Sequence, residues 1–171
     1  MEEFWNIVHF FAFTFLKKTS TALDKISPIT LCLKIPAVKK FFIKRGGTIE
    51  MINDAADNVV NNQLIGVNIW YAGLIMVSLI FIPCFALNLY YFSIFGMIKE
   101  FENFVLLIVI YTAFSSIINY YLILHKGKYL KYFKKFRKQS QEWKVKWAWI
   151  SAGTILFPVL MLIGSFIALS K

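Results

Sequence analysis

Few side chains in this sequence have the types and spacing that catalysis or metal binding requires. His9 and His125 stand far apart, and no group of Cys, His, Asp and Glu has the spacing of a metal site. Asp54 and Asp57 lie among asparagines, a pattern that we interpret as a solvated helix face rather than a cation site. Nucleotide-binding and hydrolase motifs are absent from the sequence. We therefore expect no enzymatic activity, no cofactor and no bound metal.

A second group of polar side chains lies inside an otherwise apolar stretch. Thr112, Ser116 and Asn119 follow one another at the helical spacing i, i+4, i+7, and Ser115 lies beside them. Unpaired amides and hydroxyls are costly in hydrocarbon, so we expect this face to contact protein or water. Two interpretations stay open: adhesion between helices, or the lining of a pore formed by several copies.

The apolar stretches dominate the chain. Of its 171 residues 58% are hydrophobic and 16% are charged, whereas soluble domains carry about 25% charged residues. Mean hydropathy is +0.62. No Asp, Glu, Lys or Arg occurs in Leu64–Ile98, Asn103–His125 or Trp147–Ser170. Because about 20 apolar residues cross a bilayer, we predict an all-α polytopic membrane protein with three transmembrane helices, which excludes a soluble enzyme, a secreted disulfide scaffold and a disordered chain.

Aromatic pairs help to set the ends of the spans. Trp70-Tyr71 and Tyr90-Tyr91 are separated by about 30 Å of helix, the thickness of the hydrocarbon core. We place the spans at about 68–91, 103–124 and 147–169, with a short hairpin connection between the first two. The expected segments are a cytoplasmic N-terminal region (1–64), the first span with an outer-interface extension (65–98), the second span (103–124), a basic cytoplasmic loop or helix (125–146) and the third span (147–170).

The N-terminal region is expected to contain an interfacial and an amphipathic helix. The aromatic run Phe4–Leu16 reaches only about 20 Å as a helix, too short to span, so an interfacial or re-entrant helix is expected. Prolines and lysines keep Ser27–Lys44 at a surface. After a turn at Gly46-Gly47, Thr48 is a candidate N-cap for an amphipathic helix that runs through Leu64 directly into the first span.

The basic residues predict the orientation. Seventeen of the 19 Lys and Arg lie in residues 1–64 and 125–146, and the other two are Lys99 and Lys171. Since basic loops stay in the cytoplasm, three spans place the N-terminus in the cytoplasm and the C-terminus outside. The expected location is the cytoplasmic (inner) membrane.

The segment after the second span combines basic and aromatic residues. Tyr129, Phe133 and Phe136 recur at helical spacing between lysines. We expect the segment to lie on anionic lipid headgroups; docking of a soluble or membrane protein partner is the second interpretation, and nucleic acid is disfavoured. The residues expected to face lipid or partner are Lys128, Lys131, Lys134, Lys135, Arg137 and Lys138.

Small residues and prolines suggest how the spans pack. The third span contains the small-xxx-small pairs Ala148/Ala152 and Gly164/Ala168, which permit close helix approach. Pro158 in this span and Pro83 in the first are expected to kink their helices. Asn88, on the same face as Cys84, is an interhelical or pore-lining candidate. Cys84 and Cys32 are expected to be unpaired.

Two function classes are compatible with this layout. The first is a small, non-enzymatic, homo-oligomeric effector or pore-like component with a basic cytoplasmic docking surface; accessory membrane proteins of antiviral (phage) defence offer an analogy in size and layout. The second is a non-conducting subunit, immunity protein or assembly factor of a larger membrane complex. A homogeneous homo-oligomer in detergent favours the first class, whereas a monomer or obligate heteromer favours the second.

Overall fold

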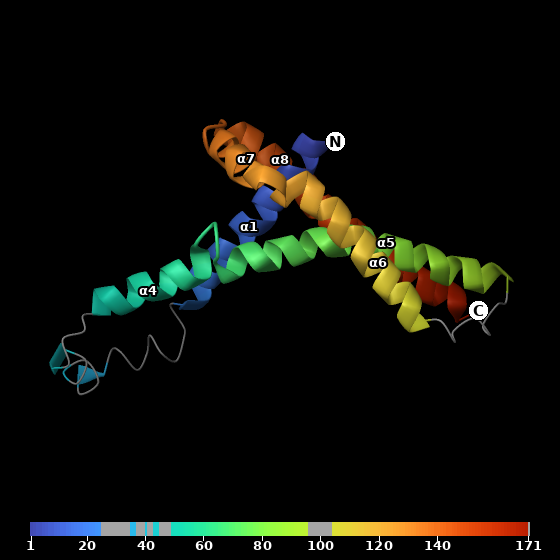
Figure 1. Ribbon diagram of the computed structural model, residues 1–171, viewed down its shortest axis with the longest axis horizontal. Coiled ribbons are helices and arrows are strands. Elements are labelled where there is room, and N and C mark those ends of the chain that lie inside the picture. Colours follow the sequence, from blue (N-terminus) through green and yellow to red (C-terminus); the bar gives the residue numbers. More distant parts are fainter. Residues whose placement is uncertain (25–34, 37–39, 41–42, 45–48, 96–103, 171) are drawn as a thin grey trace. The chain divides into compact units, whose positions relative to one another are not determined.

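The computed structural model describes residues 1–24, 35–36, 40, 43–44, 49–95 and 104–170, which form helices joined by short turns (Figure 1). The elements are α1 (Glu2–Asp24), α4 (Ile49–Asn61), α5 (Val67–Phe95), α6 (Phe104–Asn119), a π-helical turn (Tyr120–Leu124), a 3-10 turn (His125–Gly127), α7 (Lys128–Arg137) and α8 (Gln141–Leu169). The predicted all-α class is confirmed.

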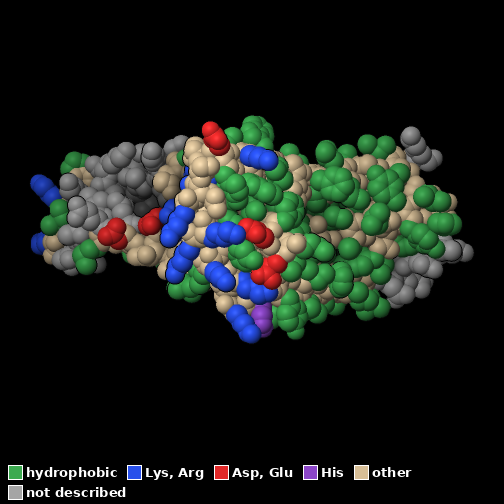
Figure 2. All heavy atoms as spheres, turned by 90° about the horizontal axis from the view of Figure 1, so that it is seen from above, with side chains coloured by type: hydrophobic (Ala, Val, Ile, Leu, Met, Phe, Trp, Pro, Cys, Tyr) green, Lys and Arg blue, Asp and Glu red, His purple; other side chains and the backbone are tan. Residues whose placement is uncertain are grey.

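Three of the described helices are long and apolar enough to cross a membrane, which confirms the predicted number of candidate spans. They are α5, α6 with its continuation to Arg137, and α8. Together, α6 and the π turn reach about 30 Å at 1.5 Å per residue, the thickness of the hydrocarbon core. By length and composition the chain is a multi-pass membrane protein. On the face drawn in Figure 2, hydrophobic side chains cover a broad region without charged groups, and Lys and Arg gather at its edge.

Two helices begin or end beyond their predicted bounds. Helix α8 begins at Gln141 rather than Trp147, because the Ser140 hydroxyl accepts a hydrogen bond from the Trp143 amide (3.3 Å) and caps the helix. Helix α1 continues past Leu16 to Asp24. Hydroxyl groups in its last turns donate hydrogen bonds to backbone carbonyls of the preceding turn. The Thr19 hydroxyl, for example, donates to the Phe15 carbonyl (2.9 Å).

The chain forms two compact units, Met1–Ala12 with Gly73–Lys171, and Phe13–Ala72. In the second unit, Asn68 on α5 donates to Asn61 on α4 (2.7 Å) and to the Ser20 hydroxyl on α1 (2.9 Å). The Asn61 amide nitrogen donates to Asp57 (2.6 Å). Because Asn61 and Asn68 are buried, these bonds tie together the three helix segments of this unit.

The amphipathic helix α4 does not run directly into the first span, and that prediction is wrong. Helix α4 ends at Asn61, and α5 begins at Val67. Between them, the Asn62 side chain accepts a bond from the Leu64 amide (2.8 Å), and its carbonyl accepts one from Gly66 (2.9 Å). A Cβ at Gly66 would lie 2.6 Å from the Asn62 nitrogen, so only glycine fits this turn.

Several predicted features lie outside the described residues. They are the turn at Gly46-Gly47 with the Thr48 cap, Cys32, most of Ser27–Lys44, and the hairpin connection in residues 96–103.

Candidate functional site

A network of polar contacts in the first unit surrounds the bend between α6 and α7, residues 120–127, which we call the α6–α7 bend. Here the helix loosens into the π turn Tyr120–Leu124 and tightens into a 3-10 turn. Lys126 and Gly127 both adopt left-handed conformations, with φ of 57° and 62°. Two successive left-handed residues redirect the chain, because they point its continuation away from the axis of α6.

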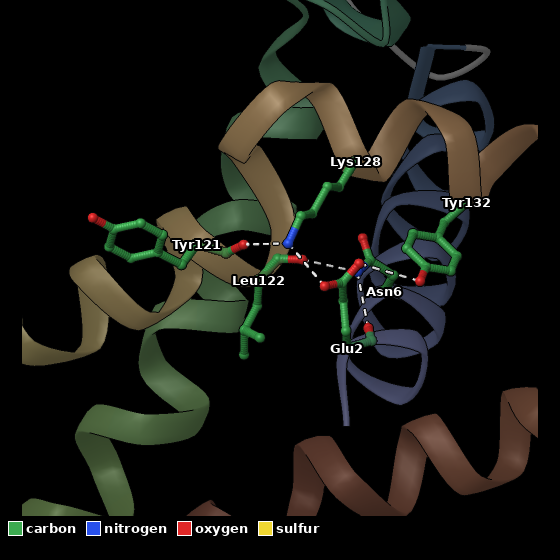
Figure 3. A network of polar contacts seen from close by, with 6 residues as sticks. All are labelled: Glu2, Asn6, Tyr121, Leu122, Lys128 and Tyr132. Carbon is green, nitrogen blue, oxygen red and sulfur yellow. Dashed lines mark hydrogen bonds and ion pairs between the residues drawn. The ribbon is translucent and has the colours of Figure 1, made fainter.

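Side chains outside the bend take up carbonyl groups that the π turn releases. The Tyr121 carbonyl accepts a hydrogen bond from Lys128 Nζ (3.1 Å), and the Leu122 carbonyl accepts one from Asn6 Nδ2 (3.0 Å) (Figure 3). The Asn6 amide also donates to the Glu2 carbonyl (2.9 Å). Since unpaired carbonyls are costly near hydrocarbon, the first turns of α1 help to stabilise the bend.

Ion pairs join α1 to α7, the helix that follows the bend. Lys128 lies 2.8 Å from Glu2 and Lys135 lies 2.7 Å from Glu3, and the Tyr132 hydroxyl donates to the Glu2 carboxylate (3.2 Å). The hydrogen bond from Lys128 holds the pKa of Glu2 below its ordinary value, although partial desolvation opposes it. Lys128 and Lys135, predicted to face lipid or a partner, therefore contact acidic residues of α1. The other predicted basic residues, Lys131, Lys134, Arg137 and Lys138, are exposed.

The aromatic face of α7 packs on α1. The imidazole of His9 lies against the rings of Tyr129 and Phe133, with centroid distances of 5.8 and 5.3 Å. Phe133 also contacts Phe10 (5.2 Å), and Phe136 stacks on Trp143 of α8 (5.4 Å). The amphipathic pattern thus reflects packing within the chain, and this aromatic face does not lie on headgroups.

His9 is the most unusual side chain of this interface. It is 1% exposed, and neither ring nitrogen has a hydrogen-bond partner in the described part of the chain. Burial lowers its pKa from 6.5 to about 4, because an imidazolium would lose its hydration there. The imidazole is therefore neutral at pH 7. The Oδ1 atom of Asn6, one turn away, also lacks a partner among the described residues.

The polar residues predicted to share one face of the second span differ in burial: two are buried and two are exposed. Asn119 is buried: its Oδ1 accepts a bond from the Trp5 indole (2.7 Å), and its nitrogen donates to the Met76 carbonyl (3.1 Å). Ser115 is fully buried, whereas Thr112 and Ser116 are exposed. Asn119 therefore turns towards α1 and α5, and the two outer hydroxyls point away from the chain.

Asn88 on α5 also makes its contacts within the chain. Its nitrogen donates to the Cys84 carbonyl (3.0 Å) and to the hydroxyl of Tyr111 on α6. Pro83 lies inside α5 a turn earlier, and Cys84 is a free cysteine. Asn88 is thus an interhelical contact between α5 and α6.

The two small-xxx-small pairs of α8 differ in their contacts: one lies against α5, whereas the other is more exposed. A Cβ at Gly164 would collide with the Tyr90 hydroxyl of α5, and the Ala168 carbonyl accepts a bond from Ser93 of α5 (2.8 Å). This pair therefore lies against α5. Ala152 is exposed, and Ala148 is half-buried. Pro158 is buried inside α8.

The residues considered for metal chemistry are dispersed. Within the described ranges no three Cys, His, Asp or Glu side chains come together as a metal site. Asp54 and Asp57 are exposed on α4. His125 lies at the α6–α7 bend against the rings of Tyr120 and Tyr121, far in sequence from His9.

Sequence reasoning missed the part that the first turns of α1 play. Trp5, Asn6 and the acidic pair Glu2-Glu3 all contact α6, α7 or the bend between them. Two signals were available: Asn6 is an amide in an apolar run, and Glu2-Glu3 is an acidic pair in a chain whose later segment, residues 126–146, is basic.

The comparisons with known proteins gave no relative: no family model, no curated protein and no solved structure matches this chain.

Proposed function

We propose that this chain is a non-enzymatic subunit of a homo-oligomer in the cytoplasmic membrane, in which the outer face of α6 borders a pore-like path. The N-terminus lies in the cytoplasm and the C-terminus outside, as the basic residues favour. An assembly of this kind suits an effector or accessory role, and phage defence is one setting for it.

The observation that carries this proposal is the exposure of Thr112 and Ser116. Both residues are exposed on the outer surface of α6, one helical turn apart, whereas the other polar residues Ser115 and Asn119 of this mostly apolar helix are buried. In hydrocarbon, such groups gain by contact with protein or water rather than lipid tails. A symmetric ring of copies would supply that contact at every subunit.

The chemistry of this face predicts the properties of the path. Thr112 and Ser116 offer hydroxyls without charge, so discrimination between cations and anions would be weak. Phe114 and Ile117 are exposed on the same helix. Apolar side chains beside a narrow path favour gating by dewetting.

A second candidate, a non-conducting subunit or assembly factor, is favoured by a different observation. Asn119 and Asn88, two amides inside the spans, are occupied by contacts within the chain. The exposed hydroxyls of Thr112 and Ser116 then remain to line a path. Such hydroxyls serve equally well in adhesion to another membrane protein. An immunity protein belongs to this class.

Paired measurements on one double variant separate the candidates. Thr112→Val with Ser116→Ala removes both hydroxyls at nearly constant volume; Thr154→Val is the matched control, because that hydroxyl on α8 bonds to its own helix at Ile150 (2.8 Å). Oligomeric state is measured by light scattering in detergent, and ion flux in liposomes at several voltages.

The proposal predicts a homogeneous oligomer whose flux falls at least tenfold in the double variant and is unchanged in the control. A monomeric wild-type chain, or an oligomer without ion flux, would contradict the pore and leave the non-conducting subunit.

A further inference from the structure

Helix α7 lies where lipid headgroups are expected. It is the basic, C-terminal part of the second candidate span, Phe104–Arg137, and the third candidate span, α8, follows it directly. Aromatic residues mark the boundary before and after α7: Tyr120 and Tyr121 are exposed where α6 ends, and Trp149 is exposed near the start of α8. Tyr and Trp concentrate at membrane–water interfaces. The ten residues of α7 therefore lie at or just beyond this boundary.

One face of α7 remains free for a partner. Its aromatic face is buried on α1 and Trp143. On the opposite side, Lys131, Lys134 and Lys138 follow at i, i+3, i+7 and are exposed. We call these three residues the basic face of α7.

The acidic residues nearby do not neutralise this face. In the described part of the chain, the ion pairs of α7 are those of Lys128 with Glu2 and Lys135 with Glu3. Lys131 is near enough to help lower the pKa of Glu2, but forms no ion pair with it. The three lysines thus present uncompensated positive charge beside the membrane.

We propose that the basic face of α7 binds the phosphate of anionic lipid headgroups. Charge complementarity at the membrane boundary favours this occupant. Single-stranded nucleic acid would also need aromatic rings for its bases, and Tyr129, Phe133 and Phe136 are buried. This inference does not depend on whether the chain forms a pore.

The experiment measures which lipid the full chain retains. Detergent-purified protein is equilibrated with micelles of equal phosphatidylglycerol and phosphatidylcholine, separated by gel filtration, and its bound lipid is quantified by mass spectrometry. The test variant is Lys131→Gln with Lys134→Gln. The matched control is Lys17→Gln with Lys18→Gln, which removes the same charge from exposed positions on α1.

The wild type and the control should retain phosphatidylglycerol in excess. The test variant should bind it about 25-fold more weakly, roughly fivefold for each lysine, at an unchanged melting temperature because the replaced side chains are exposed. Equal retention of the two lipids by the wild type, or an unchanged excess in the test variant, would overturn the proposal. Tighter binding of a single-stranded oligonucleotide than of phosphatidylglycerol, measured as displacement of bound phosphatidylglycerol by the oligonucleotide, would also overturn it.

Discussion

The indole nitrogen of Trp5 donates a hydrogen bond to the Asn119 side chain over 2.7 Å and thereby joins α1 to the second span. The same amide donates to the carbonyls of Met76 on α5 (3.1 Å) and Ser115 on α6 (2.8 Å). One buried amide therefore holds three helices in register, and its hydrogen-bonding capacity is used within the chain.

This relationship predicts a measurable coupling between Trp5 and Asn119. Asn119→Leu leaves the Trp5 N–H and the Met76 carbonyl without their partner and should lower the free energy of unfolding by about 1–3 kcal/mol. Trp5→Phe should cost about 1 kcal/mol. Because both changes break the same bond, the double variant should lose less than the sum of the single losses. Denaturation in detergent provides these values.

Ser116→Ala is the control for this cycle, since its hydroxyl is exposed on the same helix, and it should change monomer stability by less than about 0.5 kcal/mol. If the losses from Trp5→Phe and Asn119→Leu are additive in the double variant, the Trp5–Asn119 hydrogen bond contributes nothing to stability.

His9 predicts a loss of stability in mild acid. The unfolded imidazole binds a proton below its ordinary pKa of 6.5, whereas the buried one stays neutral until about pH 4. The unfolded state thus binds more protons in this window, and the free energy of unfolding falls as pH drops from 6.5 to 4. At 1.36 kcal/mol per pKa unit the loss approaches about 3 kcal/mol.

His9→Phe tests this assignment, because a phenyl ring fits beside Tyr129 and Phe133 and does not titrate. The variant should lose most of the dependence on pH between 6.5 and 4, while His125→Phe should keep it. An equally steep dependence in His9→Phe would assign the effect to another group.

The three spans were predictable because hydrocarbon imposes length and apolarity on any chain that crosses it. Which side of α6 faces inward was not predictable. Thr112, Ser116 and Asn119 share a face by spacing alone, but Asn119 turns inward because the Trp5 indole and the Met76 carbonyl lie there. Such partners come from segments distant in sequence, about which periodicity carries no information.

The two faces of α7 were predictable from the sequence, but the partner of its apolar face was not, because that partner is distant in sequence. The amphipathic pattern of α7 indicated an apolar and a basic face correctly, but a pattern cannot say what covers the apolar one. We expected lipid to cover it, but in the structure His9 and Phe10 of α1 pack against Phe133 on this face. The break before α5 depended on the side chain of Asn62 and the lack of space at Gly66, which are local contacts rather than periodic ones.

The small residues of α8 should respond differently to added bulk. Gly164→Leu would force Tyr90 off α8 and should destabilise the folded chain by about 1–3 kcal/mol, the cost expected of overpacking. Ala152 is exposed, so Ala152→Leu should leave monomer stability unchanged and act, if at all, on assembly. Melting temperature and light scattering in detergent distinguish the two effects. Equal melting temperatures for Gly164→Leu and the wild type would refute the α5–α8 contact.

Glu2 and Glu3 should limit lipid binding at α7. Glu2→Gln with Glu3→Gln releases Lys128 and Lys135 from their ion pairs and should raise phosphatidylglycerol retention above that of the wild type. The increase should shrink in 1 M salt, where the Debye length is about 3 Å. Reduced retention in low salt would show that the ion pairs instead hold the basic face in its binding position.

Site-directed labelling tests most directly the predicted topology, in which α8 crosses the membrane from the cytoplasm to the outside. Cys32 and Cys84 are replaced by Ala, and single cysteines are placed at Gln141 and Ser170, exposed positions at the two ends of α8. A membrane-impermeant maleimide should label Gln141→Cys only from the cytoplasmic side and Ser170→Cys only from the outside. Labelling of both positions from the same side would contradict the account.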